Sequence, residues 1–436
     1  MTRAACVDVG STFTKGLLVD LADGRVCGRA ASPTTSGTDV LEGLDAVLAA
    51  VGASPADEVL VCSSAGGGLR IAVIGYEEAV TALAGHRVAL SAGGRVVHVA
   101  AGRLDREAVG ALRRARPDVL LLVGGTDGGN SDVLVHNATR LANARLAAPV
   151  VLAGNRDAAA ECVAVLKGKG RTVIVADNVL PRIGELAPAR AREAIREVFL
   201  RHVIGGKGLS RGPRFASLVR MATPDAVLLG VELLASARGE DVLALDIGGA
   251  TTDVYSALIP RGEDAGLRRE ISPAPRVLRT VEADLGMRWS APGIVEGAAR
   301  EHLPLSAGVG EYAQSVHEDI ELLPASPADW DREIELATAA ALLAVRRHAR
   351  PGHPGDAPRA LKEAGVLIGS GGVLRHAPDG RGDAVLAAVL ADHGGGWVVP
   401  VAARYAVDTA YLLFAAGLLS RDHPAAAAHL ARVIGG

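Results

Sequence analysis

The chain has 436 residues, of which 49% are hydrophobic, 22% are charged and only 3% are aromatic. This composition is typical of a folded protein of two or three domains with a core of Ala, Val and Leu, and it excludes a disordered chain. The formal net charge is −3 at pH 7, so charge gives no reason to expect nucleic acid or an anionic membrane as the main partner.

Cysteine usage and hydropathy indicate a cytoplasmic protein without a membrane anchor. The four cysteines, Cys6, Cys27, Cys62 and Cys162, lie far apart, so we expect neither a disulfide framework nor a thiolate zinc site. The N-terminus has no signal-peptide core. The apolar stretch at residues 409–419 is shorter than the roughly 20 residues that a membrane span needs, which predicts a buried helix instead.

Short strands and turns open the chain. Strands are expected over residues 5–10, 15–21 and 25–31. Helical spacing begins at residue 39, and from residue 58 to 177 strands rich in Val and Leu alternate with helices. This alternation favours a largely parallel sheet that is covered on both faces.

A strand in the middle of the chain repeats the first one. Val7-Asp8-Val9-Gly10 corresponds to Leu245-Asp246-Ile247-Gly248, and each is followed by small and hydroxyl residues and a second strand. The two copies lie about half the chain apart, which predicts a duplicated architecture with one site between its halves. We therefore expect one domain over residues 1–238 and a second over residues 239–436.

The first copy of the repeat continues with residues suited to phosphate. Asp8 ends a buried strand, and Gly10 lets the backbone turn and approach a ligand closely. The hydroxyls of Ser11 and Thr12, with backbone N–H groups, can hydrogen-bond phosphate oxygens, and Lys15 adds a positive charge. Taken alone, the motif also fits an ordinary hairpin turn with a polar cap.

The second copy repeats this arrangement and adds an acid. Its candidate residues are Asp246, Gly248, Gly249, Thr251, Thr252 and Asp253. Two strand-end carboxylates that face each other across a cleft, Asp8 and Asp246, would hold a hydrated Mg²⁺ and orient a water molecule. In this matched context, a pair of ordinary turns is the less favoured interpretation.

A third motif follows the second acid motif. An apolar strand ends there in a glycine-rich turn formed by Gly369, Ser370, Gly371 and Gly372. Such a turn can open a helix and admit adenosine or phosphate against bare backbone. Its position after the second acid motif is what gives this motif weight.

The order of the three motifs resembles the superfamily that unites sugar and acetate kinases, heat-shock chaperone ATPases and actin. The resemblance implies an α/β fold of two ribonuclease-H-like domains with Mg-ATP in the cleft between them. Asp8 and Asp246 would be the metal-binding and water-positioning acids, and Asp253 is a third candidate for positioning the water. The remaining residues of the first two motifs would contact phosphates, and Gly369 to Gly372 would flank the nucleoside. A final helix around residues 405–419 would cross back between the domains.

Further segments resemble a narrower family nearly end to end, the glutamate mutase L protein (MutL/GlmL) family. That family is unrelated to the DNA mismatch repair protein of similar name. The matching segments are CSSAGGGL at 62–69, LVGGTDGGN at 122–130, AGNRD at 153–157, NVLP at 178–181, TPDAVLL at 223–229 and IGSGG at 368–372. Gly67 and Arg70 depart from the pattern, where Ala and Lys are expected. The family is associated with adenosylcobalamin-dependent carbon-skeleton mutases, which implies an ATP-driven accessory or reactivating factor.

The most specific of these segments is a loop of glycines around one acid. It comprises Gly124, Gly125, Thr126, Asp127, Gly128, Gly129 and Asn130. A carboxylate on a bare loop at the end of a parallel strand is placed where ligands usually bind. Asp127 could add a third acid to the nucleotide site or bind another ligand, and a tight turn capped by Asp127 or Ser131 fits equally well.

Three functions are compatible with these motifs. The favoured hypothesis is an ATPase that couples nucleotide state to domain closure and so to a partner mutase. The second is a metabolite kinase, in which Asp127 and the CSSAGGGL loop would supply a general base and a substrate pocket. The third is a nucleotide-binding scaffold with negligible turnover.

Overall fold

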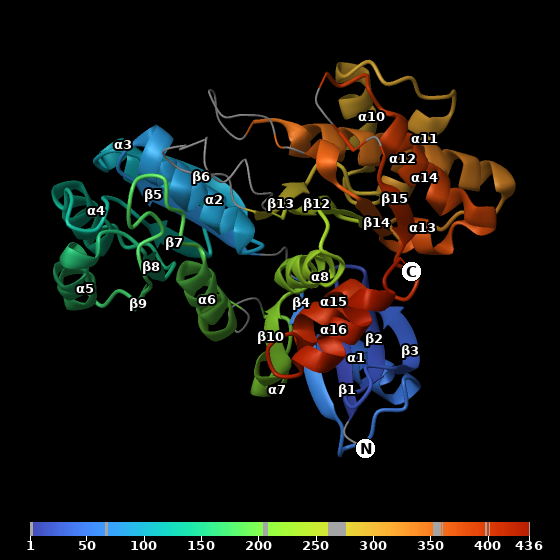
Figure 1. The fold of residues 1–436 in the computed structure, drawn as a ribbon, viewed down its shortest axis with the longest axis horizontal. Coiled ribbons are helices and arrows are strands. Elements are labelled where there is room, and N and C mark those ends of the chain that lie inside the picture. Colours follow the sequence, from blue (N-terminus) through green and yellow to red (C-terminus); the bar gives the residue numbers. More distant parts are fainter. Residues whose placement is uncertain are drawn as a thin grey trace.

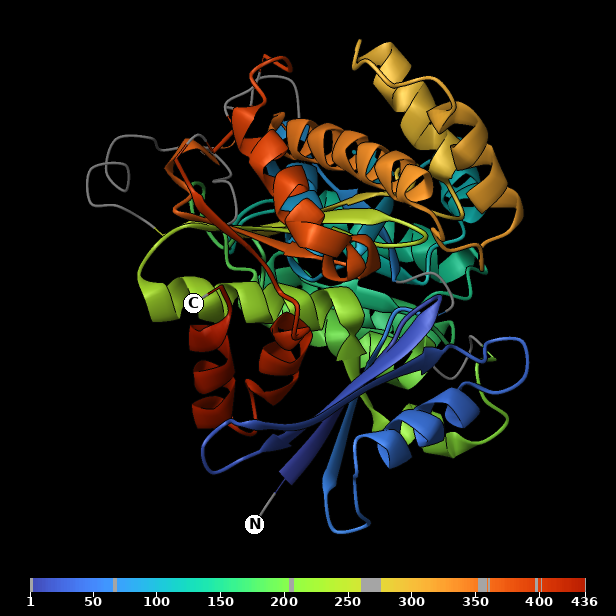
Figure 2. The ribbon, with the colours of Figure 1, turned by 90° about the vertical axis from the view of Figure 1, so that its right-hand side faces the viewer.

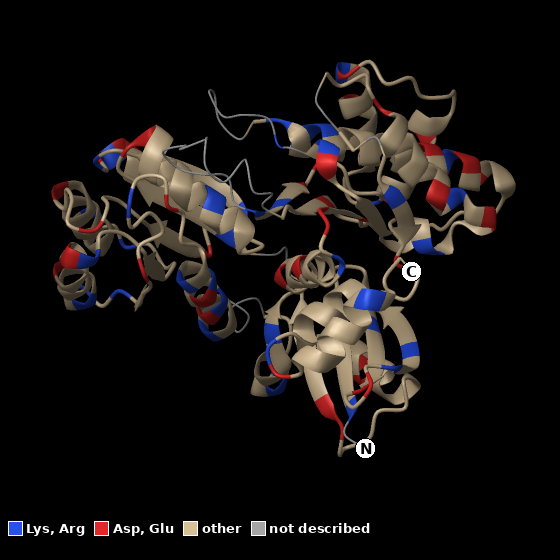
Figure 3. Cartoon of the chain, in the orientation of Figure 1, with Lys and Arg blue, Asp and Glu red and all other residues tan. Residues whose placement is uncertain are grey.

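The computed structural model describes residues 3–65, 69–203, 208–259, 276–351, 359, 361–396, 399–400 and 402–435. These residues form three β-sheets of five strands each. Figure 1 shows the three sheets in separate parts of the molecule, with the N-terminus at the bottom of the view and the C-terminus at mid-height. Figure 3 shows acidic and basic residues interspersed along the outer helices, in agreement with the nearly balanced charge.

The first lobe is built on the N-terminal sheet, with the strand order β3-β2-β1-β4-β10. The strands are β1 (Arg3–Val9), β2 (Phe13–Asp20), β3 (Val26–Pro33), β4 (Glu58–Ser63) and β10 (Val219–Ala222). β1, β2 and β3 pair antiparallel, whereas β4 pairs parallel with both β1 and β10. Helix α1 (Val40–Ala50) packs on one face, and the Asp39 carboxylate caps it by accepting from the Leu41 N–H.

The second lobe repeats this topology, with the strand order β13-β12-β11-β14-β15. The strands are β11 (Val242–Ile247), β12 (Thr252–Ala257), β13 (Val277–Glu282), β14 (Val366–Ser370) and β15 (Arg404–Val407). The first three pair antiparallel and the last two run parallel to β11, as in the first lobe. The predicted fold class, α/β with two ribonuclease-H-like units, is confirmed.

Helices on the outer face of the second sheet complete the second lobe. They are α10 (Ala291–Arg300), α11 (Val309–Glu318), α12 (Pro327–Ala349), α13 (Gly372–His376) and α14 (Arg381–Ala391). A capping box begins α12, in which Ser326 accepts from the backbone N–H of Asp329 and the Asp329 carboxylate accepts from that of Ser326. The apolar residues of α10, α12 and α14 share one core with β11.

An inserted unit, residues 69–203, lies in the chain between β4 and β10. Its strands are β5 (Arg70–Gly75), β6 (Arg95–Ala101), β7 (Val119–Leu122), β8 (Val150–Leu152) and β9 (Val173–Val175), all parallel and in the order β6-β5-β7-β8-β9. Its helices are η1 (Glu78–Ala82), α2 (Leu83–Ser91), α3 (Arg106–Ala115), α4 (Asp132–Asn143), η2 (Arg156–Ala158), α5 (Ala159–Gly168), α6 (Ala189–Val198) and η3 (Phe199–Val203). Helices α2 and α6 cover one face and α3, α4 and α5 the other.

The doubly covered parallel sheet predicted for residues 58–177 is therefore present, but β4 is not part of it. The periodicity predicts the type of each strand, whereas the choice of sheet depends on long-range pairing. Residues 1–238, which the sequence assigned to one domain, contain two sheets. Strands β5 and β6 of the inserted unit were not predicted.

Three helices form a layer between the two lobes. They are α8 (Thr223–Arg238), α15 (Leu412–Leu419) and α16 (Pro424–Val433). Figure 2 shows α8 between the lobes, with α15 and α16 beneath it. Their apolar residues share a core with Cys6 and Leu60 of the first sheet and with Val242 and Ile368 of the second. Both lobes therefore rest on this helical layer.

The predicted single helix over residues 405–419 is wrong at its start. Residues 404–407 pair with β14 as strand β15, and the helix begins only at Leu412. The Asp408 carboxylate accepts hydrogen bonds from the N–H groups of Leu412 and Leu413, which fixes the start of α15. Every residue of α15 is buried, as predicted. No helix in the described part of the chain combines the length and apolarity needed to cross a membrane.

A buried histidine makes the second lobe sensitive to acid. His348 of α12 is fully buried, and its ring nitrogens lie 2.8 Å from Thr280 Oγ1 and 2.9 Å from Ser256 Oγ. Burial, together with the charge of Arg359, lowers its pKa well below the usual value. Below about pH 6.5 His348 is therefore protonated in the unfolded chain but stays neutral in the folded protein.

We expect this histidine to reduce the free energy of unfolding by about 1 kcal/mol between about pH 6.5 and pH 5.5. Urea unfolding of the wild type and of His348→Gln at both pH values tests this. The variant should lose that share of the pH dependence, even if it is less stable at neutral pH. An identical pH dependence in both proteins would contradict the prediction.

Candidate functional site

Two hairpins, one in each lobe, have the same backbone geometry. In the first hairpin (residues 8–15) the N–H of Gly10 donates to the carbonyl of Phe13 at 3.1 Å. In the second hairpin (residues 246–253) the N–H of Gly248 donates to the carbonyl of Thr251 at 2.9 Å. Asp8 lies opposite Lys15, and Asp246 lies opposite Asp253. The repeat recognised in the sequence is thus a repeat in three dimensions.

The tips of the two hairpins meet between the lobes. A Cβ atom on Gly249 would lie 3.2 Å from Thr12 Oγ1, so the turns are close enough for one small ligand to touch both. Thr12 Oγ1 is buried and has no hydrogen-bond partner among the described residues. A buried polar atom without a partner is costly, and a ligand oxygen between the hairpins would supply the missing bond.

Asp8 is buried at the end of β1, with 2% of its surface exposed. Its Oδ1 accepts from Thr223 Oγ1 at 2.5 Å and from the Cys62 thiol at 3.7 Å. Burial raises the pKa of Asp8, and the positive charge of Lys15 opposes that shift. The other oxygen, Oδ2, lies 4.0 Å from where a Cβ on Gly10 would be, so it faces the turn.

Lys15 lies beside the aromatic ring of Tyr411, a residue that the sequence motifs did not place at the site. Its Nζ is 4.0 Å from the centroid of the Tyr411 ring and hydrogen-bonds the Tyr411 hydroxyl. The guanidinium carbon of Arg375 lies 4.6 Å from the centroid of the same ring. Two cations on one ring form a cation–π cluster next to the acids.

Tyr411 adopts a left-handed conformation, with φ of +61°, which is rare for a bulky residue. Burial, and after it the charges of Asp246 and Asp8, raises its pKa well above the usual value. The only sequence signal for Arg375 is its place three residues after the glycine-rich turn. No sequence pattern indicated that Tyr411 lies at the site. Both reach the site through the folding of the second lobe and the helical layer.

Asp246 and Asp253 have different surroundings. Asp246 lies opposite Ser370 of β14. Burial raises its pKa, with Lys15 as the largest opposing charge. Asp253 is engaged at both oxygens, because Arg279 donates to Oδ1 at 3.0 Å and Thr251 donates to Oδ2 at 3.2 Å. Burial raises the pKa of Asp253 as well, against the charge of Arg279.

The donor set of the two hairpins suits a hydrated magnesium ion. The Asp8 and Asp246 carboxylates are close enough for the charge of Asp246 to raise the pKa of Asp8, and both offer the oxygen ligands that Mg²⁺ prefers. Among the residues that the structure describes, no group of three or more His, Cys, Asp or Glu is arranged to hold a metal. Binding through water therefore stays a prediction.

The glycine-rich turn at residues 369–372 follows β14 in the second lobe. Gly371 has φ of +110°, and a Cβ there would lie 2.2 Å from the carbonyl oxygen of Ile247, so only glycine fits between β14 and β11. At Gly372, the first residue of α13, a Cβ would meet nothing within 4 Å. The turn thus packs on one side against β11 and leaves the other side open.

The Gly124–Asn130 loop is held within the inserted unit. Asp127 Oδ1 accepts from the backbone N–H of Arg156 and from Asn178 Nδ2, both at 3.0 Å. Asn178 Nδ2 also donates to the carbonyl of Gly125, and Asn155 Nδ2 donates to that of Gly129. The three family-like segments at residues 122–130, 153–157 and 178–181 are thus joined by hydrogen bonds. Ser131 forms no side-chain cap on α4.

The structure brings Asp127 together with Asn155 and Asn178 of the inserted unit. The hydrogen bonds that the Asp127 carboxylate accepts from Arg156 and Asn178 both stay inside that unit. Of the CSSAGGGL segment, residues 66–68 lie outside the described residues. Its role as a ligand loop therefore stays a prediction, as does that of Asp127.

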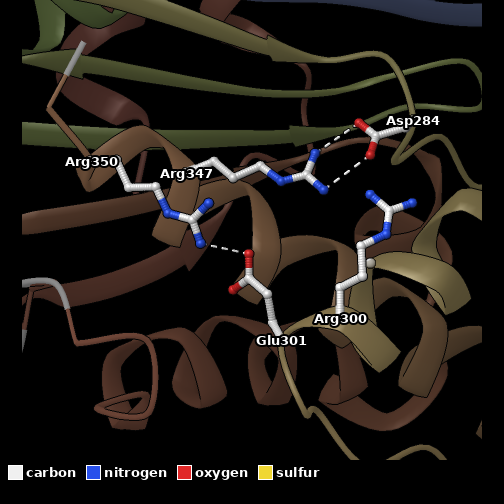
Figure 4. A pocket seen from close by; sticks show the side chains of 6 residues that line it. Asp284, Arg300, Glu301, Arg347 and Arg350 are labelled. Atoms are coloured by element: carbon white, nitrogen blue, oxygen red, sulfur yellow. Dashed lines mark hydrogen bonds and ion pairs between the residues drawn. The ribbon is translucent and has the colours of Figure 1, made fainter. Parts of the chain in front are cut away.

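A cavity of about 510 Å³ lies at the β13 side of the second lobe. Figure 4 shows that arginines and acids line it in pairs. Arg347 donates to both oxygens of Asp284, at 2.8 and 3.0 Å, and Arg350 donates to Glu301 at 2.6 Å. The first pair joins α12 to the segment after β13, and the second joins the end of α12 to the end of α10. None of the predicted site residues lines the cavity.

Comparison with known proteins identifies relatives over nearly the whole chain. The model of a family described as "MutL protein" matches residues 4–433. Protein MutL of Clostridium tetanomorphum is 31% identical over 443 residues, covering 96% of this chain and 96% of the relative.

Solved structures resemble the chain more distantly. The nucleotide-free structure of acetone carboxylase is 15% identical, with a TM-score of 0.37 over 88% of this chain and 67% of the other. Component A of (R)-2-hydroxyglutaryl-CoA dehydratase from Acidaminococcus fermentans is 10% identical, with a TM-score of 0.31 over 99% and 97% of the two chains. With TM-scores this low, these structures add nothing to what the strand order shows.

The family match and the curated relative agree with the resemblance carried by the GGTDGGN, AGNRD and NVLP segments, which fold together in the inserted unit. The chain therefore belongs to the MutL protein family.

Proposed function

We propose that this protein binds Mg-ATP between its lobes and hydrolyses it as an accessory or reactivating factor for an adenosylcobalamin-dependent carbon-skeleton mutase. The observation that carries the nucleotide site is the meeting of two equivalent hairpins, with an acid at the base of each and with the Thr12 hydroxyl, which has no partner among the described residues, beside Gly249. The kind of partner rests on the resemblance to the glutamate mutase L family.

The residues of the hairpins fit separate tasks in phosphoryl transfer. Thr12 and the turn amides would hydrogen-bond the phosphates, and Lys15 would leave the Tyr411 hydroxyl to neutralise their charge. A bound magnesium ion supplies further charge neutralisation. Asp8 Oδ2 faces the turn, whereas both oxygens of Asp253 are already engaged. Asp8 and Asp246 are therefore better placed than Asp253 to orient the attacking water.

The coupling to a partner follows from the same geometry. A nucleotide that touches both hairpins holds the lobes together across α8, α15 and α16, and loss of the γ-phosphate removes part of that bridge. The two nucleotide states then differ in lobe geometry. A mutase that binds one state more tightly is driven by hydrolysis, because only such a difference in affinity can do work.

Calorimetric titration of the purified protein with ATP and with ADP, each with Mg²⁺ and with EDTA, tests the site. We expect micromolar binding that weakens at least about tenfold, or about 1.4 kcal/mol, when Mg²⁺ is removed. Absence of binding under all four conditions would contradict the proposed nucleotide site.

A second experiment tests the partner. The protein is added to glutamate mutase that has been inactivated by turnover, together with ATP, Mg²⁺ and fresh adenosylcobalamin. We expect mutase activity to return with ATP and not with a non-hydrolysable analogue. Nucleotide binding without recovery would instead support a scaffold, and ATP consumption stimulated by a small acceptor would support a kinase.

A further inference from the structure

One buried arginine joins the inserted unit to the second hairpin. Arg279 lies on β13, opposite Tyr255 of β12, and has 6% of its surface exposed. Its Nη2 donates to Asp253 Oδ1 at 3.0 Å, and its Nη1 donates to the carbonyl oxygen of Gly93 at 2.5 Å. Gly93 belongs to the inserted unit, directly after α2. A single guanidinium therefore holds a hairpin acid and a backbone carbonyl from another sheet.

The position of Gly93 is itself fixed. Its φ is +71°, and a Cβ there would lie 2.9 Å from the backbone nitrogen of Asp225 in the first turn of α8. Asp225, which is buried, forms an ion pair with the half-buried Arg196 of α6, at 2.6 Å. The turn that presents the Gly93 carbonyl to Arg279 thus lies directly against the first turn of α8 in the helical layer. Helix α2, which precedes this turn, packs beside β13.

The same turn of α8 also reaches the first hairpin. Thr223, two residues before Asp225, donates its hydroxyl hydrogen bond to Asp8. Contacts that start at Gly93 therefore lead to an acid in each hairpin, through Arg279 on one side and through α8 on the other. All of these residues are buried, so water does not weaken the connections.

We propose that Arg279 is a positioning residue through which the inserted unit sets the geometry of the second hairpin. A movement of the inserted unit carries the Gly93 carbonyl with it. Arg279 must then follow the carbonyl or stay with Asp253, and in both cases one hydrogen bond of the hairpin acid network changes. A protein bound to the inserted unit could in this way alter a site in which it has no residue. Only the identity of the ligand rests on the proposed function, since the mechanical link exists without nucleotide.

Hydrogen exchange of the nucleotide-free protein tests this link. The variant is Gly93→Ala, whose added Cβ displaces the turn from Asp225 without touching either hairpin. The matched control is Gly170→Ala, also in the inserted unit, at a glycine with φ of +70° where a Cβ meets nothing within 4 Å. Both variants carry the same backbone strain, but only the first disturbs the contact.

We expect amides of residues 246–256 to exchange at least about tenfold faster in Gly93→Ala than in the control. Exchange in β3, which has no part in the network, should be equal in both. Equal exchange of residues 246–256 in the two variants would overturn the proposal. This outcome is independent of whether ATP binds.

Variants of the arginine give a second measurement. Arg279→Gln should accelerate exchange of both residues 246–256 and the end of α2, and Arg279→Lys, which keeps one charged donor, should restore part of the protection. If nucleotide binds, Arg279→Gln should lower kcat at least about tenfold while the Kd for ADP changes less than about threefold. Equal losses in kcat and in ADP affinity, with no rescue by lysine, would show a merely structural role and overturn the proposal.

Discussion

Replacing Asp8 by asparagine is expected to lower Mg²⁺-dependent ATP hydrolysis at least about 100-fold, because it removes the charge that we propose positions water and metal between the hairpins. Asparagine keeps the size of the side chain and an acceptor for Thr223, so the first lobe should remain folded. Asp246→Asn should behave in the same way, since Asp246 occupies the equivalent place in the second hairpin. Steady-state phosphate release, measured alongside thermal unfolding, separates lost chemistry from lost structure.

The control for this experiment is Asp20→Asn. Asp20 is also buried and lies at the opposite end of the β1–β2 pair, opposite Arg3. It accepts a hydrogen bond from the Ala22 N–H, which asparagine can also accept. Turnover of Asp20→Asn should stay within about twofold of the wild type, as for a residue remote from the chemistry. Wild-type turnover in Asp8→Asn and in Asp246→Asn would refute the assignment of the site.

The second large effect is expected at the contact between α8 and α15. A Cβ on Gly417 would lie 1.8 Å from the carbonyl oxygen of Ala226, and one on Gly230 would lie 2.0 Å from that of Leu413. The two helices therefore touch backbone to backbone, which larger residues would prevent. In an ordinary helix, glycine to alanine stabilises by up to about 1 kcal/mol. At Gly417 the clash with the Ala226 carbonyl outweighs this gain, so Gly417→Ala should lower the free energy of unfolding by about 3 kcal/mol.

Gly310→Ala provides the comparison for this prediction. Gly310 also lies in a helix, α11, but a Cβ there meets nothing within 4 Å. It should leave stability unchanged or raise it by up to about 1 kcal/mol. Urea unfolding of both variants measures the difference. Equal stability of Gly417→Ala and Gly310→Ala would mean that α8 and α15 can separate at little cost.

The sequence predicts those parts of the structure that depend on local pattern. The two hairpins were predictable because each combines an apolar strand, an acid and a glycine turn within a few residues, and their identical turn hydrogen bonds bear this out. The fold class followed from finding this pattern twice. Membership of the family was predictable because the GGTDGGN segment is both long and unusual, and the family match confirms it.

The parts that sequence could not predict depend on contacts between distant segments. The alternation of strands and helices does not say which sheet a strand joins, so the inserted unit was not separated from the first lobe. Residues 404–407 became a strand because β14 offers them an edge, against the helical expectation. Tyr411, Arg375 and Arg279 are ordinary residues in sequence, and only tertiary packing brings them to the hairpins.

The order in which the chain is made has a consequence for folding of the first lobe. Its strands β1, β2 and β3 are synthesised first, but β10, which completes the sheet beside β4, comes only after the whole inserted unit. One face of the sheet is then covered by α15 and α16, near the end of the chain. Such non-local contacts are slow to form. Strands β1, β2 and β3 thus keep apolar surface exposed until β10, α15 and α16 have been made, so this lobe needs protection during synthesis.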